Sequence, residues 1–297
     1  MGMTGIGIIG AAALICLVLA VAVRFWAAFA DMETAAEAVE GLQADAGIAQ
    51  TTGNRELQAD RAQVQKSAAG VMAVISDGIG KKNTGQVCAQ LAVDTVLDKF
   101  EPYSALNQPD YFFRTAFYEA NRRVQATIGE RKGGASLGAV FANGTHLYYA
   151  LAGNIRIALF RRGELIPLSK GQTLDILAAE AWKDGKLSRQ EAVWSMEEKR
   201  LWNYLGLDGF HEIEIESQPI LIKPGDVVFL ATCGIFEELS WSELEDLLAE
   251  TGSLKEKAEA VVSAAEQKGS AQKENGSVIL LRLSADAEKS RQYGGMT

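Results

Sequence analysis

A carboxylate and a glycine follow directly on the apolar run of residues 71–75, in the order Ser76-Asp77-Gly78. A buried strand over this run would fix the Asp77 carboxylate, and Gly78 would leave its own backbone carbonyl accessible as a further oxygen ligand. Carboxylate and carbonyl oxygens are the ligands that hard divalent cations prefer. An ordinary Asp-Gly turn has the same sequence. The pattern alone therefore leaves a cation site and a turn open.

Other metal and nucleophile chemistries have little support in the composition. The 297 residues include two His and three Cys, which argues against a His/Cys zinc site and against a disulfide framework. Cys233 could be a nucleophile, but residues 234–238 bring two glutamates where a phosphate would need an anion-binding loop. A small buried side chain at Cys233 is the favoured interpretation. The net charge of −9 argues against nucleic acid as a partner.

The elements that would position these residues follow from hydrophobic periodicity. Strands are expected at residues 71–75, 137–141, 146–151, 156–160, 226–231 and 278–281, and helices at residues 85–100, 111–128, 173–182, 189–205 and 254–267. Asn143-Gly144 and Gly153-Asn154 are expected to close hairpins. Strands in hairpins with helices inserted as blocks indicate one α+β domain over residues 45–284. The tryptophans in or near the helices are expected to be packing residues: Trp182, Trp194, Trp202 and Trp241.

The first thirty residues form a separate segment. Residues 5–23 are uncharged and, as a helix, would rise about 28 Å, close to the thickness of the bilayer core. A transmembrane anchor within residues 1–30 is the preferred interpretation. A cleaved signal peptide is the alternative, because Ala28-Phe29-Ala30 resembles a cleavage site.

The charges that flank the apolar segment bear on its orientation. Arg24 follows it and no basic residue precedes it, which favours a single-pass protein of the cell membrane with its domain in the cytoplasm. Residues 31–44 are rich in Ala and Glu and are expected to form an acidic juxtamembrane linker or helix. Residues 285–297 are expected to form a flexible tail.

Short motifs follow one another along residues 45–284 in a characteristic order and spacing. In chain order they are Gly53-Asn54-Arg55 with Asp60, Asp77-Gly78-Ile79-Gly80, Gly134-Ala135-Ser136, Gly153-Asn154-Ile155-Arg156, Thr232-Cys233-Gly234 and Glu274-Asn275. Together they resemble the PPM (PP2C-like) family of metal-dependent Ser/Thr protein phosphatases. The resemblance implies an α-β-β-α sandwich, in which two antiparallel sheets are flanked by helices.

The resemblance also implies roles for individual residues. The family uses two Mg²⁺ or Mn²⁺ ions and a hydroxide that attacks phosphorus, while an Arg holds the phosphate oxygens. Carried over by position, Arg55 is the phosphate clamp and Asp77 is the catalytic bridging ligand. Gly78 supplies a carbonyl ligand, and Asp60 and Glu274 supply further carboxylates.

The chain departs from the family pattern at four of these positions. Ala59 stands where the family has the Glu of an acidic pair, and Cys233 stands where it has a metal-binding Asp. Asn154 replaces the Asp associated with a third metal, and Glu274 replaces the last metal-binding Asp with a longer side chain. A thiolate is a soft ligand and a poor match for Mg²⁺ or Mn²⁺. Metal binding is therefore expected to be reduced or absent.

Two functional hypotheses follow from the resemblance. The preferred one is a membrane-anchored pseudophosphatase, a binding or regulatory module in Ser/Thr phospho-signalling. The alternative is an active Ser/Thr phosphatase with an atypical Asp/Glu site. Either would have phosphorylated Ser/Thr proteins, or a component of a Ser/Thr kinase pathway, as partners. Lys81 and Lys82 could face a phosphorylated segment, although a solvated loop is the commoner situation for such residues.

Overall fold

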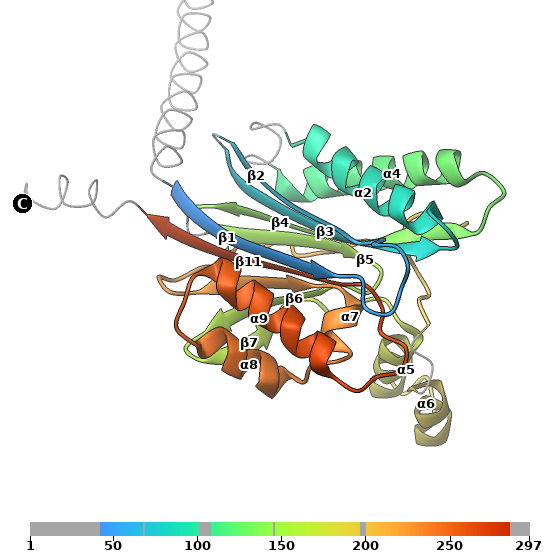
Figure 1. Ribbon diagram of the computed structural model, residues 1–297. Coiled ribbons are helices and arrows are strands. Elements are labelled where there is room, and N and C mark those ends of the chain that lie inside the picture. The colour runs from blue at the N-terminus through green and yellow to red at the C-terminus, as the bar shows by residue number, and fades with distance from the viewer. Residues whose placement is uncertain (1–41, 68, 101–107, 145, 197–199, 286–297) are drawn as a thin grey trace, which may run out of the picture. The chain divides into compact units, whose positions relative to one another are not determined.

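A computed structural model describes residues 42–67, 69–100, 108–144, 146–196 and 200–285 (Figure 1). In this part of the chain, two antiparallel sheets account for the strands. The strand order of the first sheet is β1 (Leu42–Thr51), β11 (Gly276–Ala285), β10 (Val227–Ala231), β6 (Arg156–Arg161) and β7 (Glu164–Pro167). The order of the second is β2 (Arg61–Ser67), β3 (Gly70–Gly80), β4 (Gly133–Asn143), β5 (His146–Ala152) and β8 (Glu214–Ile215), and β9 (Ile220–Leu221) also pairs with β5.

The sheets pack face to face, and strand alternation sends side chains to both faces of each. On β3, Val71, Ala73 and Ile75 point between the sheets, while Met72 and Val74 point to the outer, helix-covered face. All five are buried. A strand buried on both faces produces the continuous apolar run seen in the sequence, because no position needs to be polar.

Helices cover the outer face of each sheet, which gives an α-β-β-α sandwich (Figure 1). Helices α2 (Thr84–Asp98) and α4 (Pro109–Ile128) cover the second sheet, and α8 (Trp241–Ala249) and α9 (Leu254–Gln267) cover the first. Three further helices lie toward the ends of the strands: α5 (Leu174–Lys183), α6 (Arg189–Met196) and the single turn α7 (Cys233–Phe236). The predicted α+β class and two-sheet sandwich are therefore present.

The six expected strands correspond to β3, β4, β5, β6, β10 and β11, and the expected hairpin at Asn143-Gly144 joins β4 to β5. The second expected hairpin was wrong. Strand β5 belongs to the second sheet and β6 to the first, so the Gly153-Asn154 turn carries the chain from one sheet to the other. Ile155, which follows this turn, is fully buried between the sheets.

Two elements at the ends of the domain differ from the expectation. Strand β1 begins at Leu42 and pairs along its length with β11, which continues to Ala285. Residues 42–44 therefore belong to the domain and not to the linker. This strand was not predicted because its residues are small. They are small where α9 lies close: a Cβ on Gly47 would lie 2.7 Å from the backbone nitrogen of Lys255. Close helix packing thus requires the residues that make β1 look weakly apolar.

The helices agree with the expectation except in three places, one of which is the unexpected single turn α7. The helix expected over residues 189–205 is described only as far as Met196, and Leu205 pairs with Ala135 as an isolated bridge. Helix α8 was missed, although its capping box of Ser240 and Glu243 is visible in the sequence.

Of the tryptophans expected to pack, Trp182 and Trp241 are 46% and 40% exposed, and Trp202 is partly buried. The side chain of Trp194 lies outside the described part of the structure. The expected anchor, residues 5–23, lies outside the described residues, as do residues 31–41 of the expected linker and residues 286–297 of the tail. No helix within the described ranges is long and apolar enough to cross a membrane.

Candidate functional site

The two sheets bring four of the predicted site residues to one end of the sandwich. Asp77 lies near the end of β3, and Asp60 directly precedes β2. Cys233 begins α7 directly beyond β10, and Glu274 lies just before β11. A cleft of about 720 Å³ opens here, and its lining includes Asp77, Cys233 and Glu274.

Asp60 is fully buried beneath this cleft and is held by hydroxyl groups. Its Oδ2 accepts hydrogen bonds from Thr232 Oγ1 at 2.8 Å and from Ser277 Oγ at 2.7 Å. Its Oδ1 is buried and has no hydrogen-bond partner within the described residues. Burial, and then the nearby Asp77, raise the pKa of Asp60 to about 8. Folding therefore favours the protonated form of the Asp60 carboxyl relative to the unfolded chain.

Asp77 contacts the residue that replaces a metal ligand of the family. The Cys233 Sγ lies 3.1 Å from Asp77 Oδ2, as a thiol donating to a carboxylate does. Burial and the Asp77 carboxylate raise the pKa of the Cys233 thiol well above its usual value, which keeps the thiol protonated. Burial raises the pKa of Asp77 to about 6, and the Cys233 hydrogen bond opposes this shift.

Gly78 occupies a position that only glycine can fill. A Cβ there would clash with the carbonyl oxygen of Gly85 at the start of α2 and would lie 2.7 Å from the carbonyl oxygen of Ala59. In turn, a Cβ on Gly85 would lie 2.6 Å from the Gly78 carbonyl oxygen. The two glycines let the end of β3 and the first turn of α2 approach each other, which places Asp77 at the floor of the cleft.

Arg55 and Glu274 form a two-point ion pair at the mouth of the cleft. Arg55 Nε donates to Glu274 Oε2 at 2.9 Å, and Arg55 Nη2 donates to Oε1. Both side chains are about half exposed. The predicted phosphate clamp is thus engaged by the residue that was predicted to hold a metal.

Ala59 and its neighbours are held by Asn275, a residue whose role was not predicted. Asn275 Oδ1 accepts from the Ala59 backbone nitrogen at 2.8 Å, and its Nδ2 donates to the carbonyls of Thr52 and Leu57 at 2.9 and 3.0 Å. These hydrogen bonds between the Asn275 side chain and backbone atoms fix the segment that carries Arg55. At position 59 itself, no side-chain ligand is offered to the cleft.

Asn154 lies on the far side of the cleft, in the turn between the sheets. Its backbone nitrogen donates to Ser136 Oγ at 3.1 Å, and its Oδ1 is buried with no hydrogen-bond partner within the described residues. Lys81, Lys82 and Glu237 also line the cleft. Lys81 and Lys82 lie in the β3–α2 loop. For them the sequence left two situations open, a solvated loop and contact with a phosphorylated segment, and the first is the commoner.

These residues do not fit a centre of two hard cations. Such a centre needs several anionic oxygen ligands around both ions. Across the ranges that the structure describes, no three His, Cys, Asp or Glu side chains form a group that could hold a metal ion. Near Asp77 the additional donor is a protonated thiol, and Glu274 is paired with Arg55. The donor set favours hydrogen bonds and an ion pair over metal ligation.

Comparison with known proteins agrees with the architecture. No protein-family model matches the chain. The serine/threonine phosphatase stp of Listeria welshimeri is 23% identical over 215 residues, which span 70% of this chain and 82% of that protein. The serine/threonine phosphatase of S. agalactiae superposes with a TM-score of 0.72 at 20% identity, covering 82% of this chain and all of that structure.

The chain has the PPM (PP2C-like) phosphatase fold. The chain is thus similar to serine/threonine phosphatases in sequence at 23% identity and in fold at a TM-score of 0.72. A neighbour with the PPM fold, the catalytic domain of the phosphatase PstP in complex with two manganese ions, has a TM-score of 0.65 at 19% identity and covers 82% of this chain and 99% of that structure.

Proposed function

We propose that this chain is a PPM-fold pseudophosphatase, which binds phosphorylated Ser/Thr segments of a protein partner without turning them over. The observation that carries this proposal is the contact between Cys233 and Asp77. A neutral thiol replaces an anionic oxygen ligand next to the carboxylate that the family uses to bridge its ions. Ala59 removes a further ligand, so the negative charge needed to hold two cations is lacking.

Binding of a phosphate is supported by the cations at the same cleft. Arg55, Lys81 and Lys82 all line it, and Arg55 presents the planar fork that suits phosphate oxygens. The Arg55–Glu274 ion pair is exposed, and exposed pairs contribute at most about 1 kcal/mol. A phosphate with nearly two negative charges would therefore displace Glu274 from Arg55.

An active phosphatase of low turnover is the second candidate, and one observation favours it. Asp60 keeps a buried oxygen, Oδ1, without a hydrogen-bond partner in the described part of the chain, and a bound cation would satisfy that oxygen. Mg²⁺ or Mn²⁺ would then be the cofactor, with Asp60, Asp77, the Gly78 carbonyl and Glu274 as ligands. The relatives, which are phosphatases, are consistent with this alternative.

The proposed cellular setting rests on the sequence. Residues 5–23 would anchor the chain in the cell membrane as a single span, residues 31–41 would link the anchor to the domain, and the PPM-fold domain would face the cytoplasm. There it would meet phosphorylated proteins or a Ser/Thr kinase-pathway component as partners.

Phosphopeptide binding to the full-length protein in detergent micelles tests the proposal. Calorimetry with a phosphothreonine peptide and its unphosphorylated form, both in EDTA, should show binding that depends on the phosphate. Arg55→Ala should weaken that binding by about tenfold to a hundredfold, because a charge-assisted pair contributes about 1.5–3 kcal/mol. Peptide that binds only after Mn²⁺ is added, or that loses its phosphate during the titration, would favour the active enzyme.

A further inference from the structure

Two neighbouring loops at the rim of the cleft carry a cluster of cations. Strand β3 ends at Gly80, β4 begins at Gly133, and these two glycines pair with each other in the second sheet. Because the strands are antiparallel, the residues just after Gly80 lie beside those just before Gly133. The loops thereby bring together four basic residues, here called the basic patch: Lys81, Lys82, Arg131 and Lys132.

The start of α2 holds the two loops together. A Cβ on Gly133 would lie only 2.6 Å from Thr84 Cγ2, so the first residue of α2 packs against the start of β4. A depression of about 60 Å³ is lined by Asn83 and Thr84 together with Arg131. The Arg131 guanidinium also donates to two carbonyls in the last turn of α4, at 3.2 and 2.8 Å. The basic patch therefore lies on one packed surface between the start of α2 and the end of α4.

The domain does not neutralise the basic patch. All four residues are exposed, and none of their side chains forms an ion pair with a carboxylate in the described ranges. Residues 79–84 and 129–134 contain one acidic residue, Glu130, so four cations against one carboxylate leave a surplus of three positive charges. The whole chain has a net charge of −9, and this surplus therefore runs against its overall charge. A local surface of this kind attracts an anionic partner.

The basic patch continues the cleft on the side of the second sheet. Lys81 and Lys82 line the cleft itself, and Arg131 lines the depression beyond them. A segment that is bound in the cleft and leaves it on this side thus passes over the basic patch. The patch belongs to the surface that such a segment would contact.

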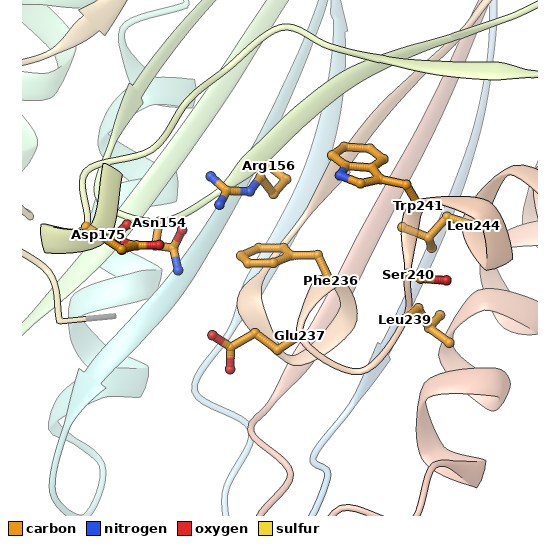
Figure 2. A pocket seen from close by; sticks show the side chains of 10 residues that line it. Asn154, Arg156, Asp175, Phe236, Glu237, Leu239, Ser240, Trp241 and Leu244 are labelled. Carbon is orange, nitrogen blue, oxygen red and sulfur yellow. The ribbon is translucent and has the colours of Figure 1, made fainter. Parts of the chain in front are cut away.

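The side of the cleft that belongs to the first sheet carries carboxylates instead. Glu237 of α7 and Glu274, just before β11, line the cleft there. A phosphate that displaces Glu274 from Arg55 leaves this carboxylate unpaired. Beyond lies a second cavity of about 230 Å³, which shares Glu237 with the cleft (Figure 2). Its cation, Arg156, lies 4.9 Å from the centroid of the Phe236 ring and is partly buried, so no exposed cation balances the carboxylates in this cavity.

We propose that the basic patch binds a run of acidic residues in the protein partner, on one side of the phosphorylated residue that occupies the cleft. The proposal rests on the proposed function and adds a sequence requirement to it. Several exposed cations along a surface suit several carboxylates along a segment, because each contact is weak and the contacts act together. The carboxylates on the first-sheet side repel the same acidic residues. The acidic run is therefore favoured on only one side of the phosphate.

Three threonine peptides, each made with and without phosphate, test the preference. One has three glutamates before the threonine, one has three glutamates after it, and one has alanines on both sides. Affinities for the full-length protein in detergent micelles are measured in EDTA. Glutamates on one of the two sides should raise affinity about tenfold over alanines, because each of three exposed ion pairs adds about a factor of two. Raising the salt from about 50 to about 300 mM should reduce this gain to about threefold, because exposed charges are screened.

Substitutions of Lys132 then locate the effect, because this exposed residue lies outside the lining of the cleft. Lys132→Ala should reduce the gain from glutamates about twofold, and the charge reversal Lys132→Glu should reduce it about fivefold. In the alanine peptide, Lys132→Ala should change the preference for phosphate by less than about twofold. Lys255→Glu on α9 changes the net charge as much as Lys132→Glu and should keep the gain. Thermal unfolding verifies that each variant is folded.

The outcomes separate the basic patch from the phosphate site. Equal affinity for glutamate and alanine peptides, or an equal gain on both sides of the threonine, overturns the patch proposal, whether or not the phosphate matters. A gain that Lys132→Glu leaves unchanged also overturns it, because the acidic run then binds elsewhere. A gain on one side that Lys132→Glu removes supports the patch. If that gain is present but the phosphate itself adds no affinity, the patch is supported while the phosphate site is contradicted.

Discussion

At the scale of the residue, the buried carboxyl of Asp60 links stability to pH. In the folded protein the pKa of Asp60 is about 8 and that of Asp77 about 6, against an ordinary value of 3.8. The folded state thus keeps protons that the unfolded chain loses above about pH 4. The contribution of these groups to stability is fully present below pH 4 and is lost as pH rises toward 8.

Asp60→Asn should remove most of this pH dependence. The amide oxygen can still accept from the Thr232 and Ser277 hydroxyls, while no charge has to be buried. Urea unfolding in EDTA should show the variant to be about 2 kcal/mol more stable than the parent at pH 8, with a smaller difference at pH 5. Asp98→Asn, an exposed control, should follow the parent. An unchanged slope in Asp60→Asn would show that this carboxyl is ionised in the folded state.

The Arg55–Glu274 pair predicts an unusual gain of affinity. Glu274→Gln removes the competing carboxylate and should tighten phosphothreonine-peptide binding about twofold to fivefold, because Arg55 no longer has to leave an ion pair. Glu56→Gln is the matched control, since Glu56 lines the same cleft and its loss changes the net charge equally. Glu274 would instead be a metal ligand if Glu274→Gln bound the peptide more weakly, and if Mn²⁺ strengthened binding by the parent but not by the variant.

At the scale of the element, the glycine contact between β3 and α2 positions Asp77. Gly78→Ala should cost about 2–4 kcal/mol in the free energy of unfolding, because the new Cβ meets two backbone carbonyls that cannot rotate away. Gly269→Ala, where a Cβ meets nothing within 4 Å, is the control and should change stability by less than about 0.5 kcal/mol. Equal stability of the two variants would show that the end of β3 is free to move away from α2.

Helices and strands could be predicted where the hydrophobic periodicity is strong. They were missed where close packing requires small residues. The buried strand β3 and the amphipathic helix α9 are apparent in the sequence, as continuous apolar residues and as helical spacing. Strand β1 is not, because Gly47 lies against α9. The turn at Gly153 looks like a hairpin in the sequence, whereas in the structure it joins β5 of the second sheet to β6 of the first.

At the scale of the whole molecule, the sandwich gathers side chains that are far apart in the chain. Asp60 meets Thr232 and Ser277, which are 172 and 217 positions away. The motifs predicted Arg55, Asp60, Asp77 and Glu274 as candidate site residues, but they did not predict the Arg55–Glu274 pairing or the hydroxyls around Asp60. Pairings of this kind depend on which loops meet at the end of two packed sheets, and local sequence patterns carry no record of that.

Restoring ligands should restore metal binding if the scaffold is otherwise intact. The double variant Ala59→Glu/Cys233→Asp returns two carboxylates to the cleft beside Asp77. It should gain Mn²⁺ affinity over the parent by about tenfold or more, because each added anionic oxygen favours a hard cation. The pair Ala59→Gln/Cys233→Asn, similar in shape and uncharged, should gain much less. Equal Mn²⁺ affinity in all three proteins would contradict this account of the lost ligands.

The most direct test of the central claim is calorimetric titration of the full-length parent protein with Mn²⁺ and with Mg²⁺, with p-nitrophenyl phosphate turnover followed in the same samples and Asp77→Asn as the control. A donor set of one thiol and few free carboxylates predicts at most one weakly bound ion and no turnover above that of Asp77→Asn. Two tightly bound ions, with turnover that Asp77→Asn abolishes, would contradict the account and establish an active phosphatase.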